Sequence, residues 1–172
     1  MKNKAKGLYF YYFCWQLGII SLVRCILKQN KIDYTLHLTF GSMWMPTFLP
    51  FFKTPFIWGP VGGGDCEPKS FLKVFPLKQR IIQSARYAMN VLSFLHPSII
   101  IPSAKAKAIL VRTPNSANVI PSYFRKKTKV ILETAMEDTI FTLHKIARQD
   151  KHGLQLITTG RLLPSKNILT AV

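Results

Sequence analysis

The sequence predicts an α/β fold, in which short strands alternate with helices. Two observations indicate this. Short runs rich in apolar and β-branched residues recur at 33–38, 55–61, 108–113, 130–134 and 154–158. Helical signals lie between them, because residues 65–95 space apolar side chains three or four apart and Pro114 is typical of a helix start. With 172 residues, 48% of them hydrophobic, the chain is long enough for a domain with a sizeable core.

The charge balance is strongly basic, with 24 Lys and Arg against 7 Asp and Glu and a net charge of +17. Such a charge favours nucleic acid, acidic lipid surfaces or phosphate-bearing substrates as partners. We expect no nucleic acid, because the chain has no dense basic block and no RNA-binding aromatic motif. The three cysteines and four histidines show no metal-ligand spacing. We therefore predict no metal site, and reduced thiols in a cytoplasmic setting.

The N-terminal stretch has two interpretations. Three lysines precede the mostly apolar residues 8–27, as in a signal sequence or a membrane anchor. The run is interrupted by Gln16, Gly18 and Arg24, and this favours a helix packed in the core. The side chains expected on the buried face of that helix are Tyr12, Trp15, Ile19, Leu22 and Ile26.

Residues 33–38 predict a strand, with His37 at or near its C-terminal end. In open α/β sheets, ligands bind at this edge, so His37 is a candidate site residue. The alternative is a strand-end histidine bonded to a neighbouring carbonyl. The apolar residues that follow, between Trp44 and Phe52, are expected in the core.

A glycine-rich loop overlaps the end of the run 55–61 and continues past it, with glycines at Gly59, Gly62, Gly63 and Gly64. Consecutive glycines suit positive φ angles or a close approach to the backbone. Their N–H groups could cradle an anion or a sugar ring. A tight turn without a ligand is the other interpretation.

The helix predicted within 65–95 is amphipathic and basic. Its expected apolar face carries Leu77, Ile81, Ala85, Ala88, Leu92 and Leu95. Lys78, Arg80 and Arg86 lie off that face and could rest on an anionic membrane or be solvated. After the strand 108–113 we expect a helix from Pro114, capped near Asn115 or Ser116, then a basic turn at 122–129 and a strand at 130–134.

Near the end, residues 154–172 predict a strand, a turn and the start of a helix. Gly160 permits the sharp turn, and Arg161 and Lys166 lie around the N-terminus of the helix. Two cations and the helix dipole together suit an anion.

Four segments together resemble group 1 glycosyltransferases of the GT-B fold. They are HLTFGSMWMP (37–46) with PFIWGPVGGG (55–64), ILVRTP (109–114), VILETAMEDTIF (130–141) and LQLITTGRLLPSKN (154–167). The resemblance implies a Rossmann-like, doubly wound parallel sheet. It implies a partial N-terminal, acceptor-side domain at 1–135, an interdomain crossing at 136–152 and the start of a nucleotide-sugar domain at 153–172.

The resemblance also implies a function. The family transfers a sugar from a nucleotide-sugar donor to a glycan or lipid-linked acceptor, with retention, in polysaccharide or cell-envelope glycan synthesis, and needs no cofactor. It places His37 beside the active site and Gly160, Arg161 and Lys166 on the donor diphosphate. The family's upstream glycine loop and paired glutamates (E-x7-E) do not occur here. We therefore expect a fragment that is inactive alone.

Two further hypotheses compete with this one. The first is a small basic membrane-associated protein anchored by residues 8–27, which should resist carbonate extraction, whereas a peripheral enzyme is released by salt. The second is a nucleic-acid binder, which rests on charge alone. For the glycosyltransferase we expect a cytoplasmic location, with peripheral contact to the inner face of the membrane left open.

Overall fold

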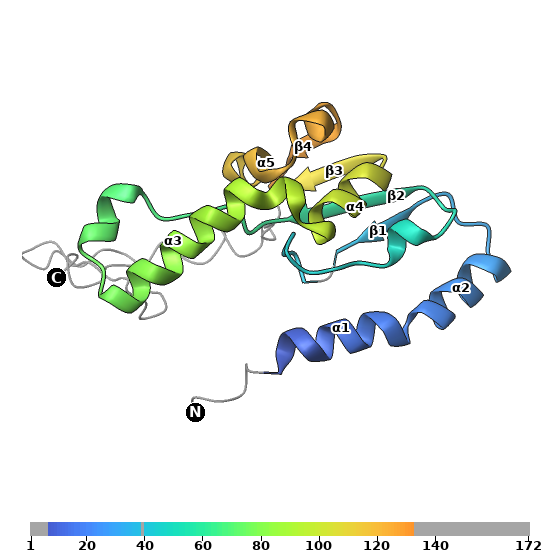
Figure 1. Ribbon diagram of the computed structural model, residues 1–172. Helices are drawn as coiled ribbons and strands as arrows, with labels where there is room; N and C mark the ends of the chain where they lie inside the picture. The colour runs from blue at the N-terminus through green and yellow to red at the C-terminus, as the bar shows by residue number, and fades with distance from the viewer. Residues whose placement is uncertain (1–6, 39, 133–172) are drawn as a thin grey trace, which may run out of the picture.

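A computed structural model describes residues 7–38 and 40–132 of the chain, and a parallel sheet lies at its centre (Figure 1). Helices are labelled α, 3-10 helices η and strands β. In chain order the elements are α1 (Leu8–Gly18), α2 (Ile20–Gln29), β1 (Thr35–His37), η1 (Leu49–Phe51), β2 (Phe56–Val61), η2 (Lys69–Lys73), α3 (Leu77–Val91), η3 (Leu92–Leu95), α4 (Pro97–Lys105), β3 (Ala108–Val111), α5 (Pro114–Val119), η4 (Ser122–Lys127) and β4 (Thr128–Val130).

The sheet has four parallel strands in the order β1-β2-β3-β4. Parallel neighbours need crossover connections. Helices α3 and α4 lie in the connection from β2 to β3, and α5 lies in the connection from β3 to β4. The predicted α/β class is thus confirmed. The strand order does not reverse within the described residues, so the doubly wound arrangement stays a prediction. All described residues fall in the predicted first domain, and the segments 136–152 and 153–172 lie outside them.

The core lies on one face of this sheet. Phe56, Trp58 and Val61 of β2 are buried, and Trp58 is in register with Ile109 of β3. Their side chains pack with Ile99 of α4 and with residues at the end of α5. The full cluster is Met43, Phe56, Trp58, Val61, Ile99, Ala106, Ile109, Val111, Val119 and Ile120. Burying such side chains contributes about 1.5–3 kcal/mol each.

The opposite face of the sheet is covered less completely by the described residues. Ile57 and Leu110 alternate with the buried residues and are half-buried. Leu36 of β1 keeps 46% of its surface exposed. Helices α4 and α5 therefore contribute to the core on one face of the sheet, and the other face stays partly exposed among the described residues.

The N-terminal helices differ from the prediction. Tyr12 is buried, but Trp15, Leu22 and Ile26 are 38%, 58% and 41% exposed, so the predicted buried face is wrong. Leu8–Gln29 is long and apolar enough to cross a membrane by length and composition, and 11% of its most apolar window is buried. Core helices and signal sequences meet the same criteria. Tyr12 packs on Phe40 at 4.7 Å between ring centroids, which fixes α1 beside the sheet.

Helix α3 is also turned differently from the prediction. The expected inner face is exposed, with Leu77 at 70% and Ile81 at 61%. Its buried and half-buried side chains carry polar groups instead, namely Gln79, Gln83, Tyr87, Asn90 and, in η3, Ser93. Asn90 and Ser93 hydrogen-bond to backbone carbonyls of neighbouring segments. Hydrogen bonding, rather than apolar burial, therefore sets how α3 faces the body of the domain.

The last elements confirm the predicted order with shifted boundaries. Helix α5 begins at Pro114 as expected, but its N-cap is Thr113, whose hydroxyl accepts the Ser116 N–H at 3.1 Å. The predicted basic turn forms η4. Strand β4 starts at Thr128, two residues before the predicted 130–134. Thr128 follows η4 directly and already pairs with Ile109 of β3.

Candidate functional site

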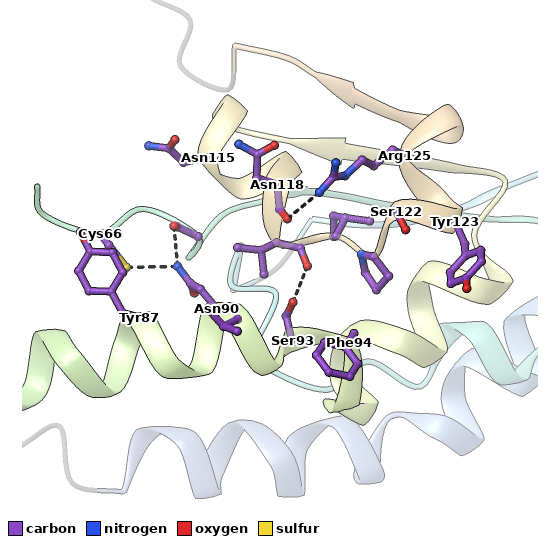
Figure 2. A pocket seen from close by; sticks show the side chains of 15 residues that line it. Cys66, Tyr87, Asn90, Ser93, Phe94, Asn115, Asn118, Ser122, Tyr123 and Arg125 are labelled. Carbon is purple, nitrogen blue, oxygen red and sulfur yellow. Dashed lines mark hydrogen bonds between the residues drawn. The ribbon is translucent and has the colours of Figure 1, made fainter. Parts of the chain in front are cut away.

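A pocket of about 700 Å³ opens at the carboxyl ends of β2 and β3. This is the edge where ligands bind in open α/β sheets. Figure 2 shows α3 and η3 along one side and α5 and η4 along the other. The lining residues are Gly64, Cys66, Tyr87, Asn90, Val91, Ser93, Phe94, Asn115, Asn118, Val119, Ile120, Pro121, Ser122, Tyr123 and Arg125.

The glycine loop after β2 is held by the protein's own acceptors. The Gly62 N–H donates to the Gly41 carbonyl at 2.6 Å, and the Gly64 N–H donates to Ser116 Oγ at 3.3 Å. These two N–H groups are therefore occupied and do not face an anion. Neither N–H group is therefore available for the anion cradle that the sequence predicts in this loop.

Close backbone packing explains why glycines are needed here. Gly59 has φ +119°, and a Cβ on it would lie 2.0 Å from the Leu110 carbonyl oxygen. Gly63 has φ +111°, and a Cβ on it would lie 3.0 Å from the Trp44 ring. The Trp44 indole N–H donates to the Gly63 carbonyl at 2.9 Å. The loop therefore packs closely against its neighbours and forms one wall of the pocket at Gly64.

Asp65, directly after the glycine loop, hydrogen-bonds to α3 and to the N-cap of α5. The Thr113 hydroxyl lies 2.9 and 3.1 Å from the two Asp65 carboxylate oxygens. Arg86 of α3 donates to the Asp65 carbonyl at 2.8 Å. The glycine loop, α5 and α3 are thus joined at a single residue.

Asn90 is fixed on the floor of the pocket. Its Nδ2 lies 2.8 Å from the Gly64 carbonyl oxygen and 3.2 Å from Cys66 Sγ (Figure 2). It also lines a smaller cavity of about 220 Å³ on the other side of the loop, beside Trp44. Asn90 therefore separates two hollows at the sheet edge.

Two titratable groups line this region. Burial raises the pKa of the Cys66 thiol, an effect that Arg86 opposes and Asp65 and Glu67 reinforce. Burial, with smaller effects of Cys66 and Glu67, also raises the pKa of Tyr87, whose hydroxyl hydrogen-bonds to the Glu67 carbonyl. Both groups are protonated at neutral pH. Cys66 is therefore a poor nucleophile.

The pocket chemistry is that of a binding site. Among the described residues that line it, seven of fifteen carry an amide or a hydroxyl, most of the others are apolar, Arg125 is the single cation and none is Asp, Glu or His. Arg125 donates to the Asn118 carbonyl at 3.3 Å. Such a surface offers donors and acceptors to a polyhydroxyl ligand. It supplies no carboxylate or imidazole for proton transfer.

The predicted site residues do not all meet here. His37 lies at the C-terminal end of β1 as predicted, but it is 5% exposed, in register with Trp58, and does not line the pocket. Gly160, Arg161 and Lys166 lie outside the described residues. Of the glycines, Gly64 lines the large pocket and Gly63 the small cavity.

Sequence reasoning missed the polar wall of α3. Tyr87, Asn90 and Ser93 recur every three residues, which places them along one side of the helix. This three-residue spacing of polar side chains is visible in the sequence, alongside the apolar face that was predicted to be buried. In the part of the chain that the structure describes, no cluster of three or more His, Cys, Asp or Glu could hold a metal ion.

Comparisons with known proteins add no identification. No protein-family model matches the chain, and neither the curated proteins nor the solved structures contain a match. The function therefore rests on the sequence motifs and on the geometry of the pocket.

Proposed function

We propose that the chain belongs to a glycosyltransferase of the GT-B kind, with its described residues on the acceptor side, and that the pocket beside the glycine loop binds a sugar of the acceptor. The observation that carries the proposal is the pocket of about 700 Å³ at the carboxyl edge of a parallel sheet, a largely apolar hollow in which seven of the fifteen lining residues carry an amide or a hydroxyl. Its size and position suit a small ligand. The aromatic rings of Phe94 and Tyr123 add apolar surface for a sugar ring.

In this proposal the pocket positions the acceptor. Asn90 is already held by Gly64 and Cys66, so the floor of the pocket is preorganised. The donor diphosphate is assigned to Gly160, Arg161 and Lys166, where the two cations would stabilise charge on the departing nucleotide. The predicted catalytic role of His37 stays outside this proposal, because the ring is buried and does not line the pocket.

The test is glycan binding by the purified full chain. A panel of disaccharides and lipid-linked sugars is titrated by isothermal calorimetry against the wild type, Asn118→Ala and the control Gln29→Ala. Asn118 lines the pocket, whereas Gln29 lies at the end of α2. Loss of one hydrogen bond should weaken binding about tenfold in Asn118→Ala and leave the control unchanged. Equal affinities, or no glycan bound, would contradict the proposal.

A membrane-associated protein anchored by residues 8–27 is the second candidate. It is favoured by the exposed apolar surface of α1, where Tyr9, Phe10 and Tyr11 are 64%, 75% and 67% exposed. Extraction of membranes separates the two functions. An anchored protein stays in the pellet after carbonate treatment, and a peripheral one is released by salt.

A further inference from the structure

We propose that the chain carries a binding site for an anionic phospholipid in a second pocket, between α2 and η1. The pocket measures about 620 Å³ and shares no lining residue with the glycine-loop pocket. It is lined by Ile20, Arg24, Leu27, Lys28, Phe48, Phe51, Phe52, Lys53 and Thr54. The proposal is independent of glycosyl transfer.

Three cations surround this pocket. Arg24 and Lys28 are one helical turn apart on α2, and Lys53 enters from the loop after η1. Among the described residues that line it, none is acidic. A guanidinium and two ammonium groups can donate hydrogen bonds to the oxygens of a phosphate diester and neutralise its charge.

Three phenylalanine rings also line the pocket, beside the aliphatic side chains of Ile20 and Leu27. Phe51 is 64% exposed, and its ring centroid lies 6.2 Å from that of Phe48. Phe48 in turn lies 6.2 Å from Phe13 of α1, so the apolar surface of the pocket continues onto the N-terminal helix. Phenylalanine beside cations is typical of surfaces that lie at the membrane interface.

The aromatic surface distinguishes a lipid from a free phosphate. An inorganic phosphate would pair with Arg24, Lys28 and Lys53 and leave Phe51 in water. A phospholipid satisfies both parts, because its headgroup meets the cations and its acyl chains cover the rings. Helix α1 adjoins α2 on the same side of the sheet (Figure 1), and its exposed apolar residues would enter the same lipid layer. The occupant is therefore a bilayer phospholipid with a negative headgroup.

Vesicle co-sedimentation of the full chain tests the site. Vesicles contain phosphatidylcholine alone or with phosphatidylglycerol, at fixed ionic strength. The pocket variant combines Arg24→Gln, Lys28→Gln and Lys53→Gln. Each cation near an anionic surface contributes about fivefold in affinity, so this variant should bind the phosphatidylglycerol vesicles about 100-fold more weakly than the wild type.

A matched control removes the same charge elsewhere, through Lys105→Gln, Lys126→Gln and Lys129→Gln on α4, η4 and β4. It should lose less than about fivefold, since these side chains lie away from the proposed lipid surface. Equal losses in the two triple variants would overturn the proposal, because net charge alone would then explain binding. Equal binding to neutral vesicles would overturn it as well.

Phe51→Ser tests the apolar part while keeping every charge. We expect about tenfold weaker binding to the same vesicles, with an unchanged circular dichroism spectrum. Unchanged binding would refute the acyl contact. Inorganic phosphate, added against chloride at equal ionic strength, should not release the chain, and release would identify a free phosphate as the ligand instead.

Discussion

Replacing Gly64 by alanine is a direct test of how the glycine loop is built. A Cβ at this position would lie 2.6 Å from Ser116 Cα, 2.8 Å from Val119 Cγ2 and 2.9 Å from the Asn115 carbonyl oxygen. Two of these atoms belong to the backbone of α5, which cannot rotate away as the end of a side chain can. Overpacking costs about 1–3 kcal/mol, and loss of the Gly64 N–H bond to Ser116 about 1 more. We expect the free energy of unfolding to fall by about 2–4 kcal/mol.

Urea denaturation monitored by tryptophan fluorescence measures this loss, because Trp58 is fully buried in the core. Gly18→Ala is the matched control. Apart from its chain neighbours and the backbone of its own helix, no atom of the described residues lies within 4 Å of a Cβ placed at Gly18, which ends α1. Alanine in a helix is favoured over glycine by about 1 kcal/mol, so the control should be as stable as the wild type or more so. A Gly64→Ala variant as stable as the wild type would refute the packing argument.

Three further predictions follow from the same structure. Trp58→Ala should lower the free energy of unfolding by about 3–5 kcal/mol in urea titrations, because the side chain is fully buried between β2 and the covering helices; a loss below 1 kcal/mol would contradict the described core. Thr113→Ala removes the N-cap of α5 and should cost about 1 kcal/mol, whereas Thr113→Ser should restore most of it. Maleimide labelling followed by mass spectrometry should modify Cys66 more slowly than the exposed Cys14 and Cys25 at neutral pH. Since burial raises the pKa of Cys66, its rate should still increase with pH beyond the ordinary thiol pKa, and an early plateau would contradict this.

The raised pKa of Cys66 also determines how this thiol changes the free energy of unfolding with pH. The folded state keeps the thiol proton to higher pH than the unfolded state does. This contribution to stability is therefore present below the unfolded pKa and is lost as pH rises through the folded pKa. It acts on the alkaline side of neutrality.

The sheet was predictable because parallel strands are short apolar runs that end at glycine or proline. Strands β2 and β3 lie within the expected 55–61 and 108–113. The start of β4 was misplaced because its first residues, Thr128 and Lys129, are polar and are half-buried or exposed. The apolar run that predicted the strand begins only at Val130, where β4 ends. The Ile131 N–H still donates to the Val111 carbonyl at 2.9 Å, which continues the ladder beyond β4.

The glycine loop was predictable as a feature but not in its role. Whether its N–H groups face a ligand depends on Gly41 and Ser116, which are distant in sequence and become neighbours only in the fold. The same applies to Asn90, whose amide is fixed by the loop 26 residues earlier. Spacing along the chain cannot supply such partners.

Helical periodicity failed at α1, α2 and α3 for a physical reason, since it identifies a face that avoids water without identifying what covers it. Helix α2 contains the distinguishing signal. Arg24 and Lys28 share one face with Ile20 and Leu27, within a little over one quarter of the helix circumference. In a protein core, that face would bury two cations, at a cost of several kcal/mol each unless they are paired. At a lipid surface, the same face meets acyl chains and phosphates together. The position of the charges, rather than the strength of the apolar pattern, therefore separates a lipid-facing helix from a core helix.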